Sequence, residues 1–134
     1  MSGQTVQRRI VIVDDDPDFL ECARIVLRSA GYQVDVATSA AEGLALIRAV
    51  APDLIITDVM MSYSMEGVDL AREIVRDPNL AHIPLFVVTS IARTLDLAGF
   101  DRETAQAVKE FFTKPVSPGD LLTRTGHYLS NREE

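Results

Sequence analysis

The sequence predicts an α/β fold: a doubly wound, five-stranded parallel sheet between two layers of helices. Five short apolar runs alternate along the chain with segments of helical periodicity. This alternation implies crossover connections, which are right-handed in nearly all proteins and place successive strands in parallel. The first run, residues 10–13, is apolar throughout, which is typical of a strand buried on both faces.

Length and composition fit one compact domain, which we expect to occupy residues 1–134. The longest apolar stretches are far shorter than the ~20 residues that a membrane span requires. The start of the chain shows no secretory signal, so a cytoplasmic location is expected. The net charge of −7 opposes direct binding to nucleic acid or to an anionic membrane surface.

The first unit is a strand at residues 10–13 followed by a helix that ends near Gly31. The strand is β-branched and stops at three aspartates. Asp16 and Pro17 have the residue types of an N-cap and a first helical position. Cys22, the single cysteine, falls on this helix and is predicted to be a packing thiol.

The next two units repeat this order. Residues 33–37 are predicted as a strand and residues 39–50 as a helix with one apolar face. A third strand, residues 54–58, ends on a carboxylate. A loop through Gly67 then leads into a helix over about residues 68–76.

The last part of the chain begins with a strand at residues 85–89, opened by a proline. The segment around Gly99 is helix-prone but ambiguous. A fifth strand is predicted at residues 110–113 and a last helix at residues 117–129.

Polar residues gather where these strands end. They are Asp14, Asp15, Asp16, Asp58, Thr89, Ser90 and Lys114. In open parallel sheets, ligands bind outside the carboxyl ends of the strands, where the strand order reverses. Converging carboxylates repel one another unless a cation neutralises them, and oxygen ligands without histidine or cysteine suit Mg²⁺ or Mn²⁺.

Four motifs, in this order and at strand ends, resemble the receiver domain of bacterial two-component response regulators. They are VDDDP at residues 13–17, PDLIITDVMM at 52–61, VTS at 88–90 and FTKP at 112–115. The resemblance covers about residues 9–130 and implies a flavodoxin-like (CheY-like) three-layer sandwich.

The resemblance also implies roles for the strand-end residues. The metal site would consist of Asp14, Asp15, Asp58 and the backbone carbonyl of Met60. Asp58 would accept the phosphoryl group, while Lys114 and the Thr89 hydroxyl would bind phosphoryl oxygens. A carboxylate can attack phosphorus when a metal offsets the repulsion between the two anions. The bond between Lys114 and Pro115 is expected to be cis.

Two further positions keep alternative interpretations. Phe111 matches an aromatic residue of the family that turns inward when the strand-end hydroxyl, here that of Thr89, moves. Phe111 could equally be a core aromatic residue. Asp16 is predicted mainly as a helix N-cap, with an outer-shell metal role as the alternative.

The chain departs from the family pattern in three places. The loop at residues 62–67 is one residue longer than usual, and residues 101–104 replace the usual small-residue turn before the fifth strand. Met60 and Ile91 take positions that flank the attacking water in receivers, and neither can orient water. Our hypothesis is therefore slow self-dephosphorylation. Met60→Asn should accelerate loss of phosphate, and an unchanged decay rate would count against the hypothesis.

The resemblance implies a signalling module rather than an enzyme. Its partners would be a histidine kinase or phosphotransfer protein, and then a downstream protein or an effector domain outside this sequence; homodimerisation stays open. One alternative is a phosphate-independent interaction module with the same fold. The other is a phosphatase of the haloacid dehalogenase type, with Asp14 and Asp16 as its acid pair; Asp18 does not fit that motif.

Overall fold

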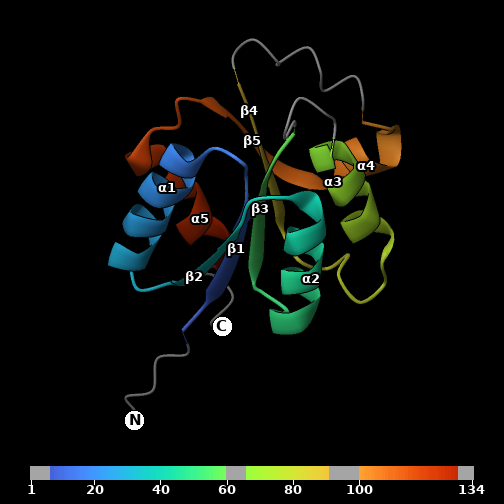
Figure 1. Cartoon of the computed structure of the whole chain (residues 1–134), viewed down its shortest axis with the longest axis horizontal. Helices are drawn as coiled ribbons and strands as arrows, with labels where there is room; N and C mark the ends of the chain where they lie inside the picture. The colour runs from blue at the N-terminus through green and yellow to red at the C-terminus, as the bar shows by residue number, and fades with distance from the viewer. Residues whose placement is uncertain (1–6, 60–65, 91–99, 130–134) are drawn as a thin grey trace.

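The computed structural model describes residues 7–59, 66–90 and 100–129, and it confirms the predicted α/β sheet with helices on both faces (Figure 1). The strands are β1 (Arg9–Val13), β2 (Gln33–Ala37), β3 (Leu54–Asp58), β4 (Leu85–Ser90) and β5 (Val108–Lys114). The helices are α1 (Pro17–Ser29), α2 (Ala40–Val50), α3 (Glu66–Arg76), α4 (Arg102–Ala107) and α5 (Pro118–Leu129).

The sheet has the order β2-β1-β3-β4-β5, and all of its neighbouring strands are parallel. β1 therefore lies between β2 and β3, and the strand order reverses there. A ligand site is expected beyond the carboxyl ends of β1 and β3.

Two buried clusters hold the layers together, one on each face of the sheet. Ile10 and Ile12 of β1 pack in the cluster under α1 and α5. Val11 and Val13 pack in the opposite cluster, with α2, α3 and part of α4. Because both faces are covered, β1 is apolar at every position beyond Arg9, as expected for a central parallel strand. Figure 1 shows the same division of the helices.

Several boundaries differ from the sequence-based prediction. β5 begins at Val108, two residues earlier than predicted. Residues 101–104, which replace the usual small-residue turn of the family, begin α4: Asp101 is its N-cap and the following residues form its first turn. Cys22 is exposed, so its prediction as a packing thiol is wrong. It lies beside Ala23, and Ala23 is the residue that turns toward the sheet.

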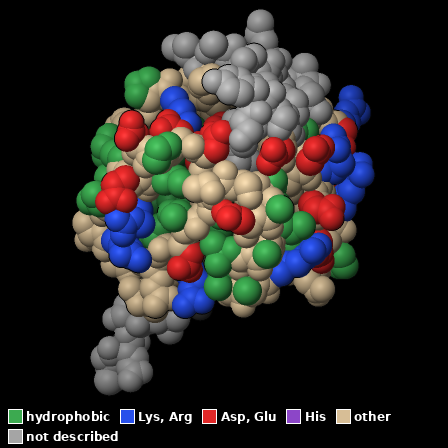
Figure 2. All heavy atoms as spheres, in the orientation of Figure 1, with side chains coloured by type: hydrophobic (Ala, Val, Ile, Leu, Met, Phe, Trp, Pro, Cys, Tyr) green, Lys and Arg blue, Asp and Glu red, His purple; other side chains and the backbone are tan. Residues whose placement is uncertain are grey.

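None of the helices in the described ranges is both long enough and apolar enough to cross a membrane. Figure 2 shows acidic and basic side chains mixed over the face in view, around exposed apolar residues. Arg48 on α2 forms an ion pair at 3.3 Å with Asp77, which directly follows α3.

Candidate functional site

Three carboxylates meet at the carboxyl ends of β1 and β3. Asp14 and Asp15 follow β1 directly, and Asp58 is the last residue of β3, the neighbouring strand. One carboxylate oxygen from each of the three lies within 4.8 Å of the others. The topology thus brings together residues that are more than 40 positions apart in the sequence, as the strand-end pattern predicts.

The three carboxylates differ in exposure. Asp14 is fully buried, Asp58 is 8% exposed, and Asp15 faces solvent. Asp14 Oδ1 accepts a hydrogen bond from the backbone N–H of Asp16 at 2.9 Å. Asp14 Oδ2 is buried and accepts no hydrogen bond from the described residues, although the Lys114 ammonium lies 3.0 Å away as an ion-pair partner. A buried carboxylate oxygen in this situation is poorly compensated for its lost hydration.

Burial, together with the negative charge of Asp58, raises the pKa of Asp14 to about 7. The Asp16 N–H and the Lys114 ammonium oppose this rise without cancelling it. At neutral pH, the positive charge near the three carboxylates therefore does not balance their negative charge.

A divalent cation fits this group. The donors are carboxylate oxygens, which suit a hard cation such as Mg²⁺ or Mn²⁺, and one of them is buried without a hydrogen-bond donor. A cation here would also relieve the repulsion that raises the pKa of Asp14. Met60, whose carbonyl the resemblance adds to the site, lies outside the described residues.

Lys114, the last residue of β5, extends over the same group. Its Nζ lies 3.0 Å from Asp14 Oδ2, 3.5 Å from Asp16 Oδ2 and 3.6 Å from Asp58 Oδ2. Burial alone would lower its pKa, but these carboxylates outweigh burial and hold the pKa above its usual value. Lys114 therefore remains a cation at neutral pH, beside the Asp58 carboxylate.

Thr89 lies at the end of β4, between β3 and β5. Its neighbour Val88 pairs with Asp58, and Thr89 itself pairs with Thr113 of β5. The residue is 2% exposed, and its hydroxyl donates to the backbone carbonyl of Ser90 at 3.3 Å. Thr89 is thus at the strand ends as predicted, with its hydroxyl engaged locally.

Gly67, in the first turn of α3, packs against the backbone of β3. A Cβ atom at this position would overlap with the carbonyl oxygen of Asp58 and would lie within about 2.5 Å of that of Val59. Glycine allows this close approach of helix and strand. Gly67 lies in α3 and not in the predicted loop, and the sequence pattern does not reveal this contact, since it depends on how α3 packs.

Other sequence predictions have mixed outcomes. Asp16 is the N-cap of α1, as predicted, and accepts hydrogen bonds from the N–H groups of Asp18 and Phe19. The bond between Lys114 and Pro115 is cis. Phe111 is 39% exposed, so the core-aromatic interpretation is wrong, and its role as a switch stays a prediction. The lengthened loop up to residue 65 and Ile91 lie outside the described residues.

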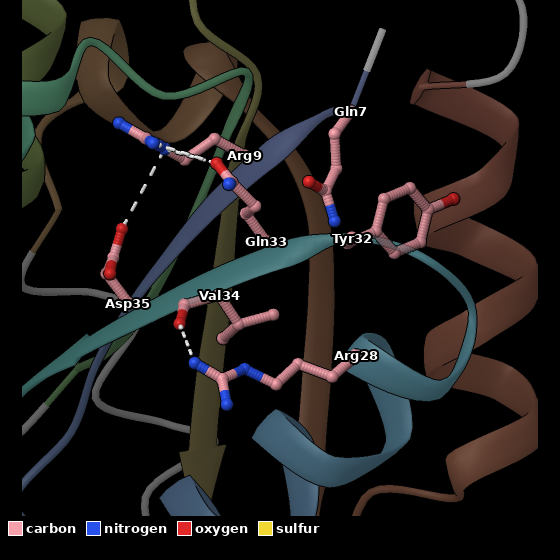
Figure 3. A pocket seen from close by; sticks show the side chains of 7 residues that line it. All are labelled: Gln7, Arg9, Arg28, Tyr32, Gln33, Val34 and Asp35. Atoms are coloured by element: carbon pink, nitrogen blue, oxygen red, sulfur yellow. Dashed lines mark hydrogen bonds and ion pairs between the residues drawn. The ribbon is translucent and has the colours of Figure 1, made fainter. Parts of the chain in front are cut away.

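Two hollows flank the fold. One, of about 540 Å³, lies beside Lys114 and is lined mainly by apolar parts of α1 and of the segment after β5. The other, of about 380 Å³, lies at the starts of β1 and β2 (Figure 3). There Arg9 donates to Gln33 at 2.8 Å and Arg28 to the carbonyl of Val34 at 3.5 Å. The second hollow therefore lies at the amino ends of the strands, whereas the carboxylates lie at the carboxyl ends.

Comparison with known proteins agrees with this geometry. The family model of the response regulator receiver domain matches residues 10–125. The DNA-binding response regulator MtrA of Mycolicibacterium smegmatis is 30% identical over 97% of this chain and 54% of its own length. The DNA-binding dual master transcriptional regulator RpaA of Synechocystis is 33% identical over 87% of this chain and 46% of its own. The chain thus spans about half the length of these two relatives.

A solved structure shows the same fold. The CheY-like receiver domain protein of Methanospirillum hungatei superimposes with a TM-score of 0.80 at 30% identity, covering 95% of this chain and 97% of that one. The family match covers most of the chain and includes all three strand-end carboxylates. This chain belongs to the family of response regulator receiver domains.

Proposed function

We propose that the chain is the phosphoacceptor of a two-component system and receives a phosphoryl group on Asp58 from a histidine kinase or phosphotransfer protein. One observation carries the proposal. Asp58 lies at a strand end, belongs to the carboxylate group that could hold a metal, and has a lysine ammonium 3.6 Å away. The buried Asp14 would hold the metal together with Asp15 and Asp58.

The reaction is a phosphoryl transfer between two protein side chains. A carboxylate oxygen of Asp58 attacks phosphorus, the bond from phosphorus to the donor nitrogen breaks, and its electron pair returns to the imidazole. The product is an acyl phosphate. When bound, Mg²⁺ or Mn²⁺ would neutralise charge on the carboxylates and on the phosphoryl oxygens.

Lys114 and Thr89 stabilise the product. Lys114 already lies near Asp58 as a cation and can pair with a phosphoryl oxygen after a small displacement. The Thr89 hydroxyl, which donates to the Ser90 carbonyl, would exchange this weak bond for a charged acceptor. A phosphoryl group adds about −1.5 to −2 charges, enough to draw both side chains toward Asp58.

The output is proposed to pass through protein contacts. A net charge of −7 argues against direct contact of this chain with nucleic acid. The relatives MtrA and RpaA are DNA-binding regulators, and this chain matches about half of each. A downstream protein or an attached effector domain would therefore read the phosphorylated state, in the cytoplasm. As a receiver domain the chain is a signalling module, and nothing in the family match favours the phosphatase or phosphate-independent alternatives.

Intact-mass spectrometry tests this proposal. The protein is incubated with acetyl phosphate, with and without Mg²⁺, as wild type, Asp58→Asn and Asp53→Asn. Asp53 is a matched control, because it directly precedes β3 and accepts a hydrogen bond from the Arg9 N–H. One Mg²⁺-dependent phosphoryl adduct is expected in the wild type and in Asp53→Asn, and none in Asp58→Asn. No adduct in the wild type, with Mg²⁺ binding shown separately, would favour a phosphate-independent module.

A further inference from the structure

Three carboxylates contact Lys114, but only two of them belong to the group that could hold a metal. Asp14 and Asp58 are members of that group, while Asp16, 3.5 Å from Lys114 Nζ, is not. A bound cation would compete with Lys114 for Asp14 and Asp58, and phosphorylation would convert the Asp58 carboxylate into an acyl phosphate. Among the described carboxylates that contact Lys114, Asp16 is then the one that can still pair with the lysine.

Asp16 is well placed to pair with Lys114, because its two carboxylate oxygens make different contacts. Oδ1 accepts hydrogen bonds from the N–H groups of Asp18 and Phe19, which fixes the side chain on the first turn of α1. Oδ2 faces Lys114. The capping bonds therefore order the carboxylate in advance, so that pairing with Lys114 costs less side-chain entropy.

The same helical turn supplies a second contact to the lysine. Lys114 Nζ lies 4.9 Å from the centroid of the Phe19 ring, within the range of a cation–π interaction. The lysine side chain is 20% exposed and the Asp16 side chain 43% exposed. Lys114 has a flexible stem with four carbons, and these two contacts with the first turn of α1 restrict its motion.

We infer that Asp16 is a positioning residue for phosphoryl transfer, holding Lys114 beside Asp58 through the first turn of α1. The inference rests on the proposed phosphoacceptor function and extends it. Simple electrostatics predicts the opposite effect for loss of this charge. Removing a negative charge near the site should favour an anionic phosphodonor, whereas releasing Lys114 should slow the transfer.

The test compares rates of labelling by acetyl phosphate at saturating Mg²⁺. Asp16→Asn is the informative variant, because asparagine is as good an N-cap as aspartate but carries no charge. Asp18→Asn removes a charge from the same turn and is the control. We expect Asp16→Asn to lower the maximal rate about three- to tenfold, Asp18→Asn to leave it unchanged or raise it, and urea unfolding of both to match the wild type.

A double-mutant cycle tests whether the effect acts through Lys114. In a Lys114→Gln background, Asp16→Asn should cause no further loss of rate. The inference would be overturned if Asp16→Asn labelled as fast as the wild type, or if it slowed the Lys114→Gln protein by the same factor.

A second measurement does not depend on labelling. NMR relaxation of the Lys114 side chain in the Mg²⁺-loaded protein should show greater motion in Asp16→Asn than in the wild type and Asp18→Asn. Equal motion in all three proteins would overturn the inference. Absence of labelling in the wild type overturns the proposed function instead, and the NMR comparison then judges the role of Asp16 separately.

Discussion

At the scale of single residues, Asp14 shows most clearly what the strand-end group lacks. It is fully buried, and its pKa is raised to about 7 by burial and by the neighbouring charge of Asp58. The 3.0 Å contact with Lys114 does not restore an ordinary pKa. The fold thus holds Asp14 in a place where its charged form is disfavoured until further positive charge arrives.

This property predicts a pH dependence for the metal-free protein. The pKa of Asp14 is higher in the folded state than the ordinary value of 3.8, so the folded state binds more protons between about pH 4 and pH 7. The contribution of Asp14 to the free energy of unfolding should therefore fall as the pH rises through this range. Urea unfolding in EDTA measures it, as the difference between the wild type and Asp14→Asn. Equal pH profiles for the two proteins would contradict the prediction.

Gly67 gives a second prediction at this scale. Gly67→Ala places a Cβ where the Asp58 carbonyl oxygen lies, so α3 or β3 must shift. We expect a loss of about 1–3 kcal/mol in the free energy of unfolding, as for other overpacked sites.

Gly119→Ala is the matched control for this substitution. Gly119 also lies in the first turn of a helix, but its nearest atom, Ser117 Oγ, would be 3.8 Å from an added Cβ. This variant should be neutral or slightly stabilising. Equal unfolding free energies for the two variants would show that α3 does not approach β3 as closely as described.

The sequence predicted the polar residues at the strand ends, and the resemblance implied the pairing of Lys114 with Asp58, but the contacts of Lys114 with Asp14 and Asp16 were not predicted. Asp14, Asp58 and Lys114 follow apolar strands, so their position at one edge of the sheet follows from parallel pairing alone. The contact of Gly67 with the Asp58 backbone and the exposure of Cys22 depend on helix orientation. Helical periodicity places a residue near a face only to within part of a turn.

At the scale of secondary-structure elements, the junction between α3 and α4 is the part that the sequence-based prediction left ambiguous. α4 spans six residues, which is too short for an apolar periodicity to appear in the sequence. Its beginning is fixed by Asp101, which accepts a hydrogen bond from the Thr104 N–H at 2.7 Å. The same carboxylate pairs with Arg72 at 3.3 Å and Arg76 at 3.1 Å, both on α3.

Asp101 therefore combines a cap with ion pairs, and two substitutions separate these roles. Asp101→Asn retains the cap and loses the charge, whereas Asp101→Ala loses both. We expect the free energy of unfolding to decrease from wild type to Asp101→Asn to Asp101→Ala, with the larger step at the loss of the cap, because exposed ion pairs contribute little. Urea unfolding at low and moderate salt checks the order. If the loss from wild type to Asp101→Asn were larger than the loss from Asp101→Asn to Asp101→Ala, the ion pairs would contribute more to stability than the cap.

Side chains of α5 donate hydrogen bonds to the backbone of the edge strand β5. The Tyr128 hydroxyl donates to the carbonyl of Lys109 at 3.4 Å, and Arg124 donates to that of Phe111 at 3.1 Å. These bonds occupy backbone acceptors that an edge strand would otherwise offer to another strand. Any homodimer at this side would therefore use side chains such as the exposed Phe111 rather than strand addition.

At the scale of the whole molecule, the alternation of apolar runs and helices sufficed to predict the fold class. Parallel strands with short crossovers leave few topologies, and the observed order β2-β1-β3-β4-β5 is one of them. The sequence pattern could not place the boundaries of β5 and α4, since residues 101–108 carry caps and short-range contacts rather than a repeating pattern. Family membership and the strand-end chemistry agree because the motifs occupy those strand ends.

The most direct test of the account identifies the residue that carries the phosphoryl group. After reaction with acetyl phosphate and Mg²⁺, borohydride reduction converts a phosphoaspartate to homoserine, and tandem mass spectrometry of peptides locates it. Conversion at Asp58 alone is the predicted result, because Asp58 belongs to the carboxylate group and also lies 3.6 Å from Lys114. Conversion at Asp14 would contradict the account and favour a phosphatase-type nucleophile at the end of β1.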